Sequence, residues 1–254
     1  MDDDKKPIAI IAIAIVVFLA GGAWWMSRDT KAPPAPQNAT PSAAVSGTEA
    51  VIAKTEALPL ELPPMEGMDA FLRPLLGALS SRPELASWLA TDDLIGQLAS
   101  AIDQAAVGNS PARDLKVIKP AGAFAATARG NQRFIEVSSY RRYDGLVQTV
   151  TSIDATRAAV LYKTIRPRLN EAYHRMGNQN SDVDNAVRKS IDILLDTPVV
   201  KDPIAIVEDG KAGWAYDDGE LEGLLPTQKQ LLRMGSANVD RVLVWLRAFQ
   251  AALG

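Results

Sequence analysis

Apolar residues recur along this chain at the spacing of amphipathic helices, from about Leu58 to the C-terminus. One stripe runs through residues 92–105 and a longer one through residues 155–176. The last stripe places these residues on one helix face: Val239, Val242, Leu243, Leu246, Phe249 and Leu253. Such spacing is typical of helices that bury one face. Because the connections are short, we predict a mainly α, compact domain of antiparallel helices packed in pairs.

Two segments interrupt the helical pattern with the signature of β-hairpins. In "AFAATARGNQRFIEVS" (123–138), aromatic and β-branched residues flank a turn at Gly130-Asn131. In "DPIAIVEDGKAGWAY" (202–216), the turn falls near Asp209-Gly210. The predicted helical domain therefore carries one or two small hairpins.

Helix boundaries are indicated by capping residues and by a tripeptide that occurs twice. We expect Ser81 with Glu84, Thr91, Asp154, Ser181, Thr227 and Ser236 to open helices. The tripeptide "RMG" ends two apolar stripes, at residues 175–177 and 233–235. A glycine just past a helix end adopts positive φ without a Cβ clash. We therefore interpret both copies as helix ends, with Gly177 and Gly235 at positive φ.

Residues 7–26, "PIAIIAIAIVVFLAGGAWWM", form an uncharged apolar run about as long as a bilayer core requires. Trp24 and Trp25 stand at its end, where indole rings favour the membrane interface. The alternative is a signal peptide cleaved near Gly21 and Ala23. The flanking lysines and arginine leave the orientation open, but one span followed by a long chain favours export of the C-terminal part. We predict a cytoplasmic tail (1–6) and a transmembrane anchor (7–26).

Residues 27–57 are rich in Pro, Ala, Ser and Thr and lack an apolar period, which is typical of a flexible linker. A coil of about thirty residues spans roughly 30 Å. Residues 58–254 would then be a mainly helical domain held near the periplasmic face of a bacterial inner membrane.

Composition and motifs argue against several activities. The net charge of −3 is unlike that of a nucleic-acid binder, and the absence of cysteine excludes disulfide chemistry. No nucleophile-elbow, dinucleotide or phosphate-loop motif occurs, and the single histidine, His174, falls in a predicted last helix turn. The segment 178–189 resembles a calcium loop but has Val183 and Lys189 where glycine and glutamate are needed. We predict no catalytic residue, no metal site and no cofactor.

An alternative remains open, namely binding or hydrolysis of cell-wall glycan. Adjacent acids occur at residues 92–93, 208–209 and 217–218, and Glu171 lies in mid-helix. A glycosidase needs an acid with a raised pKa facing a second carboxylate. A largest cleft lined by acids and aromatic rings would favour this alternative, and an exposed apolar groove would favour a protein partner.

The densest polar and aromatic cluster is "YRRYD" at 140–144. Tyr and Arg are common at the centre of protein interfaces. The alternative is that the two tyrosines face the core at positions i and i+3. As candidate binding residues we take this cluster and the basic residues of "QKQLLRMG", namely Tyr140, Arg141, Arg142, Tyr143, Lys229 and Arg233.

The order and spacing of "YRRYDGLVQTVTSIDATRAAVLYKTIRPRLNEAY", "LLDTPVV", "PIAIV" and "QKQLLRMG" resemble a bacterial envelope family. It is a domain-of-unknown-function family, number three thousand and fourteen of its series, and the resemblance covers roughly residues 59–254. It implies an N-terminal anchor, a Pro/Ala-rich linker and a domain without assigned catalytic residues. We expect a membrane-anchored periplasmic interaction or scaffold module with an envelope protein as partner.

Overall fold

The computed structural model describes residues 61–111, 120, 122–210 and 213–254. The predicted tail, span and linker (1–57) lie outside the described residues. The described helices are η1 (Met65–Gly67), α2 (Met68–Gly77), α3 (Pro83–Trp88), α4 (Leu94–Ala106), α5 (Val137–Arg141), α6 (Asp144–Thr151), α7 (Ala155–Arg175), α8 (Val183–Leu195), α9 (Gly219–Glu222), α10 (Pro226–Leu232) and α11 (Ser236–Leu253). The strands are β1 (Ala126–Arg129), β2 (Gln132–Ile135), β3 (Ala205–Glu208) and β4 (Trp214–Tyr216). The mainly α prediction is confirmed.

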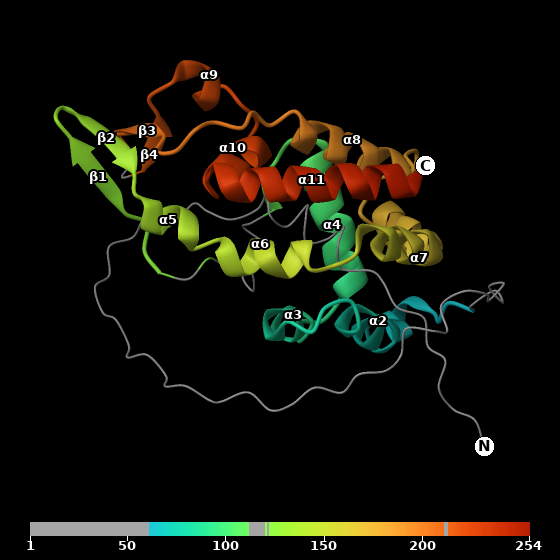
Figure 1. Cartoon of the computed structure of the whole chain (residues 1–254). Coiled ribbons are helices and arrows are strands. Elements are labelled where there is room, and N and C mark those ends of the chain that lie inside the picture. Colours follow the sequence, from blue (N-terminus) through green and yellow to red (C-terminus); the bar gives the residue numbers. More distant parts are fainter. Residues whose placement is uncertain (1–60, 112–119, 121, 211–212) are drawn as a thin grey trace, which may run out of the picture.

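The helical core forms where α4, α7, α8 and α11 pack on one another, with α6 against α11 (Figure 1). The predicted stripe of α11 is confirmed, because Val239, Val242, Leu243, Leu246 and Phe249 are buried and Leu253, in the last turn, is partly buried. Their partners on the other helices include Ile102, Ile165 and Leu194, which are buried as well. Each fully buried side chain of this kind contributes roughly 1.5–3 kcal/mol.

The prediction that neighbouring helices run antiparallel is wrong for α6 and α11. Near the start of both helices, Asn238 Nδ2 donates to Asp144 Oδ1 over 2.8 Å. Beyond the end of α6, Trp245 Nε1 donates to the Ile153 carbonyl over 2.7 Å. From the first contact to the second, the residue number rises along α6 and along α11, so the two helices run parallel. The expectation rested on short connections, whereas α6 and α11 are far apart in sequence.

Both predicted hairpins form, and they join in one antiparallel sheet of order β1-β2-β3-β4. The turn of the first hairpin lies at Gly130-Asn131, as predicted, between the paired residues Arg129 and Gln132. The two hairpins meet where Arg133 pairs with Ile206 and Phe134 with Ala205. This junction was not expected from the sequence.

One face of the sheet, the inner face, packs on a second and smaller core. Its residues Ile135, Ile206 and Tyr216 contact side chains from α5, α9 and α10. On the opposite, outer face, strand alternation and register place Thr127, Phe134, Ala205, Val207 and Ala215. These outer-face side chains are partly exposed or, at Val207, exposed.

The capping predictions succeed at Asp154, which accepts a hydrogen bond from the Arg157 amide at 2.8 Å. They fail by one or two positions elsewhere. Asp93, and not Thr91, caps α4, and Asp182, and not Ser181, caps α8. In both cases an aspartate directly precedes the first helical residue, and its carboxylate accepts from the exposed amides there.

The remaining capping predictions are also wrong. The residues that precede α3 and α10 are Arg82 and Leu225, so neither Ser81 nor Thr227 is the capping residue. Each of these helices begins with a proline. Proline suits the first helical position because that amide has no intrahelical partner.

The glycine prediction for the two "RMG" segments is confirmed, since φ is +104° at Gly177 and +82° at Gly235. Gly235 has ψ of 155°, however, which lies outside the left-handed helical region. Ser236 is the first residue of α11 and not its cap. Instead Asp202 Oδ2 accepts from both the Ser236 amide and its hydroxyl, each at 3.0 Å.

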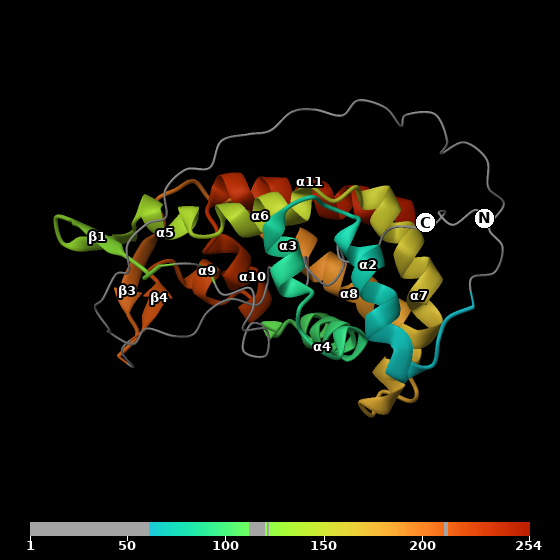
Figure 2. The same cartoon turned by 90° about the horizontal axis from the view of Figure 1, so that it is seen from below.

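The sheet lies at one end of the molecule, and the helices α2 and α7 lie at the other, next to the C-terminus (Figures 1 and 2). The described chain begins just before η1 and α2, at the end remote from the sheet. Across the described ranges, no helix combines the length and apolarity that a membrane crossing needs. The predicted span, residues 7–26, is outside those ranges.

Candidate interaction surface

Two of the candidate binding residues, Tyr140 and Tyr143, are core residues with exposed fractions of 5% and 1%. The Tyr140 hydroxyl accepts from the Ile204 amide at 2.9 Å, and the Tyr143 hydroxyl accepts from Gln230 Nε2 at 3.1 Å. This placement agrees with the alternative that the i, i+3 pair faces inward. The tyrosines therefore support the surface from below and do not form it.

Burial keeps the phenols of Tyr140 and Tyr216 neutral. Burial is the largest influence on the pKa of Tyr140. Together with the nearby Asp202 carboxylate it raises this pKa to about 12, although the hydrogen bond from the Ile204 amide acts to lower it. Burial likewise raises the pKa of Tyr216, whose hydroxyl donates to the Lys229 carbonyl at 2.9 Å. The hydroxyls thus act as fixed hydrogen-bonding groups between the sheet and the helices.

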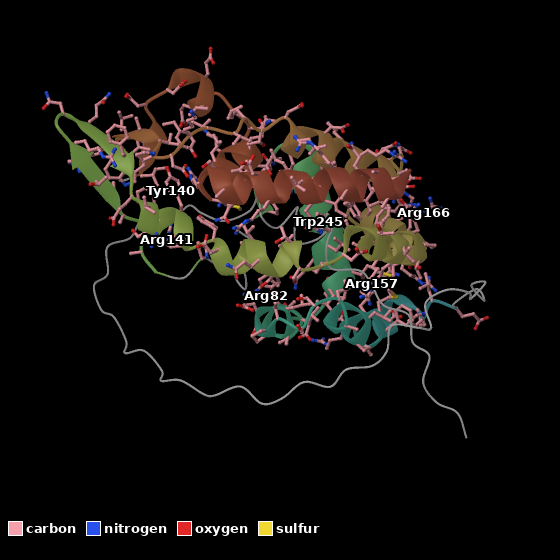
Figure 3. All side chains as sticks on the ribbon, viewed as in Figure 1. Arg82, Tyr140, Arg141, Arg157, Arg166 and Trp245 are labelled. Atoms are coloured by element: carbon pink, nitrogen blue, oxygen red, sulfur yellow. The ribbon has the colours of Figure 1, made fainter. Side chains whose placement is uncertain are left out.

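The arginines of the same segment differ from each other. Arg141 is exposed on α5, beside Tyr140 at the sheet end of the molecule (Figure 3). Arg142 is held in place, because its Nε donates to the Ser139 carbonyl at 3.1 Å and its Nη1 to the Gly122 carbonyl at 3.2 Å. Its guanidinium carbon lies 5.7 Å from the centroid of the Phe124 ring. Arg142 is therefore a preorganised cation on the surface.

Lys229 and Arg233 lie near the far edge of the sheet. Lys229 Nζ donates to Glu222 Oε1 at 2.6 Å and to the Glu222 carbonyl at 2.9 Å. Burial acts to raise the pKa of Glu222, but the Lys229 hydrogen bond, the Tyr216 amide and the charges of Lys229 and Arg233 hold this pKa, on balance, below its ordinary value. The donors of Lys229 are thus used inside the chain, so packing accounts for this residue.

An aromatic–arginine cluster brings together Phe124, Arg133, Arg142 and Trp214, of which only Arg142 was a candidate from the sequence. The Phe124 and Trp214 rings are tilted with centroids 6.2 Å apart, and the Arg133 guanidinium carbon lies 5.5 Å from the Trp214 ring. Both rings are only partly buried. Because Arg133 and Trp214 come from two separate hairpins, only the joined sheet makes them neighbours.

A shallow depression on α7 bears on the glycan alternative. Its lining residues are Pro167, Asn170, Glu171, His174, Arg175 and Gln179. The lone carboxylate, Glu171, is paired with Arg168 at 2.8 Å and with Arg175 at 2.6 Å.

The Arg168 hydrogen bond is the largest influence on the pKa of Glu171 and, with the charges of both arginines and the Arg175 hydrogen bond, lowers it on balance, although burial acts in the opposite direction. A glycosidase acid needs a raised pKa and a second carboxylate. This depression therefore gives the glycan alternative no support.

His174 is accounted for by the same helix end. It lies in the last turn of α7, where its Nε2 donates to the Ser181 carbonyl at 2.9 Å. Among the described residues, no three His, Asp or Glu side chains are grouped as a metal site would require.

The fold and surface thus define a mostly helical domain with a four-stranded antiparallel sheet at one end. The family described as protein of unknown function DUF3014 matches residues 94–250, which is more than half of the chain. The chain belongs to this family, as the sequence resemblance indicated. The matched range begins at the first residue of α4 and includes the whole sheet. No curated protein and no solved structure matches the chain.

Proposed function

We propose that this chain is a single-pass inner-membrane protein whose periplasmic domain is an interaction or scaffold module for an envelope protein. The observation that carries the proposal is the aromatic–arginine cluster on the sheet. Trp and Arg are the side chains that most often dominate protein interfaces, and aromatic side chains are enriched there.

The cluster is preorganised for contact. Arg142 is tied to two backbone carbonyls, and Arg133 lies over Trp214 with its Nη2 3.8 Å from Glu208 Oε1. Side chains that are ordered before binding lose less conformational entropy when a partner arrives. The Arg133 guanidinium also occupies one side of the indole ring, so that side is not free for a sugar to stack on. These contacts favour a protein partner.

The position of the sheet suits a tethered module. The described chain starts at the end opposite the sheet (Figures 1 and 2). An anchor at residues 7–26 and a linker at 27–57 would hold that end near the membrane. The linker spans roughly 30 Å as a flexible coil, so the sheet would project into the periplasm within reach of membrane-bound partners.

The test is affinity capture of the full chain from detergent-solubilised bacterial membranes. Arg133→Glu reverses a charge on a side chain that is 52% exposed, and the matched control is Arg247→Glu on the exposed side of α11. We expect a partner that is recovered with the wild type and the control but lost with Arg133→Glu. Equal recovery from all three chains, or loss with Arg247→Glu alone, would refute the proposal. Circular dichroism of each variant checks that the fold is intact.

A further inference from the structure

Strand β1 forms an open edge of the sheet. Among the described strands its neighbour is β2 alone, and the Glu136 amide donates to the Ala125 carbonyl at 3.0 Å. Hydrogen-bonded and non-hydrogen-bonded pairs alternate in an antiparallel ladder. The register Ala126↔Ile135 and Ala128↔Arg133 is therefore non-hydrogen-bonded. The amides and carbonyls of Ala126 and Ala128 point away from β2, and no described residue bonds to them.

The opposite edge is closed by the chain itself. The outward amide of Tyr216 on β4 donates to Glu222 Oε2 at 2.9 Å, and Lys229 holds that carboxylate from the other side. Proteins commonly protect an edge strand with proline, an inward charge, a bulge or a covering segment. The residues of β1, "ATAR", contain no proline and pair with β2 without a bulge. Described residues thus bond to the outward Tyr216 amide at the β4 edge, whereas none bonds to Ala126 or Ala128 at the β1 edge.

The two faces that flank β1 differ in chemistry. On the inner face, Ala128 is followed across the sheet by Arg133, and Phe124 is covered by Arg142. On the outer face, Thr127 pairs with Phe134, and the Arg129 guanidinium carbon lies 5.3 Å from the centroid of the Phe134 ring, so apolar ring surface and one cation lie together there. A strand added to β1 would present alternate side chains to these two faces.

We propose that the β1 edge binds an extended segment of a partner protein in which acidic residues alternate with apolar ones. This inference rests on the proposed function and identifies its contact surface. Backbone hydrogen bonds to Ala126 and Ala128 would hold the segment, as in other cases of strand addition. Its carboxylates would face Arg133 and Arg142, and its apolar side chains would face Phe134.

Charge distinguishes this partner from a second copy of the chain. Pairing two β1 strands would bring two sets of the same arginines, Arg129, Arg133, Arg141 and Arg142, to one junction. The nearby acids are Glu136 and Glu208, so the surroundings of the edge have a cationic excess. Like charges across an interface disfavour association, whereas an acidic segment is attracted.

The test uses a capped, fluorescent peptide of alternating glutamate and valine, with the full chain in detergent micelles. Ala128→Pro removes an outward amide without removing a bond to β2, and Ala128→Ser keeps that amide as the control. We expect fluorescence anisotropy to show binding that weakens with salt. We also expect about tenfold weaker binding to Ala128→Pro, the equivalent of one hydrogen bond. A peptide of glutamine and valine should bind less tightly than the glutamate peptide.

Hydrogen exchange of single amides provides the independent readout. The Ala126 and Ala128 amides should exchange fast in the free chain and slowly with the peptide, while the Thr127 amide is slow in both. Slow exchange at Ala126 and Ala128 in the free chain, or unchanged binding to Ala128→Pro, would overturn the proposal. A dimer of the free chain that dissociates with Ala128→Pro would overturn it too, because a second copy would then be the occupant. If the partner is captured but the peptide does not bind, this inference fails while the proposed function stands.

Discussion

Gly235 and Gly177 share a positive φ, yet only Gly235 lies against another side chain. A Cβ atom added at Gly235 would lie 2.9 Å from the Tyr140 Cβ, whereas one added at Gly177 would meet no atom within 4 Å. Replacing Gly177 by Ala should cost about 1–2 kcal/mol, the penalty of a positive φ. Gly235→Ala should cost about 1–3 kcal/mol more, because the Tyr140 stem must shift.

Urea unfolding of both variants measures this difference. Gly177→Ala serves as the control for backbone strain alone. Equal losses of unfolding free energy in the two variants would contradict the close approach of Gly235 to Tyr140.

Tyr140 should make the fold sensitive to alkali. Its pKa is raised from 10.0 to about 12 in the folded chain, mainly by burial. Between these two values the unfolded chain has released a proton that the folded chain still holds, so stability falls as pH rises. The contribution is fully present below pH of about 10 and is lost through about 12.

The measurement is the free energy of unfolding in urea from neutral to alkaline pH. Tyr140→Phe should lower stability at neutral pH by about 1–3 kcal/mol, since the Ile204 amide loses its acceptor. The same variant should show a smaller alkaline decline, though not none, because the pKa values of Tyr162 and Tyr216 are also raised. An unchanged decline would show that Tyr140 does not titrate as described.

The α11 helix depends on a cap from a distant part of the chain. Asp202 precedes β3, yet its carboxylate accepts two hydrogen bonds from Ser236. Asp202→Ala should therefore cost about 0.5–2 kcal/mol, the usual value of an N-cap. Ser236→Ala removes only the hydroxyl bond and should cost less. Thermal or urea unfolding compares the two variants, and a larger loss with Ser236→Ala would reverse this order of importance.

The helices could be predicted from the sequence because the local spacing of apolar residues indicates which helix face is buried. The α11 stripe shows this, since its predicted face is buried. A helix cap could be predicted only where one suitable residue directly precedes the helix, as at Asp154. At Ser236 the capping carboxylate comes from Asp202, 34 positions away, so no local pattern could indicate it.

The aromatic–arginine cluster was not predictable for a related reason. Each hairpin has its own turn signal, but the pairing of Arg133 with Ile206 is a long-range contact. Without that register, Phe124 and Trp214 remain two unrelated aromatic residues in the sequence. By contrast, the inward orientation of Tyr140 and Tyr143 was one of two stated alternatives, because i, i+3 spacing is a local property.

At the scale of the whole molecule, we predict that residues 7–26 anchor the protein in the membrane and are not cleaved. Residues 7–26 are apolar enough to remain in the bilayer, so carbonate washing of bacterial membranes should leave the full-length chain in the pellet. Release of a chain that begins near Trp24 would show instead that the segment is a cleaved signal peptide. N-terminal sequencing of the purified protein identifies which form is present.

The first described helices and the sheet lie at opposite ends of the molecule (Figure 1). If the proposed anchor holds the end where α2 lies near the membrane, a partner should meet the β1–β2 hairpin at the other end first (Figure 1). Arg157 and Arg166 on α7 lie at the end remote from the sheet (Figure 3). The central claim is therefore that contact with the envelope partner is made at the sheet end.

Site-specific photo-crosslinking in intact bacteria tests this claim most directly. The photoreactive side chain would replace either Asn131, in the exposed turn of the hairpin, or Val244, which is 65% exposed on α11. We predict a discrete crosslinked product with the residue 131 variant and none with the residue 244 variant. A product from residue 244 with none from residue 131, or none from either position, would contradict the account.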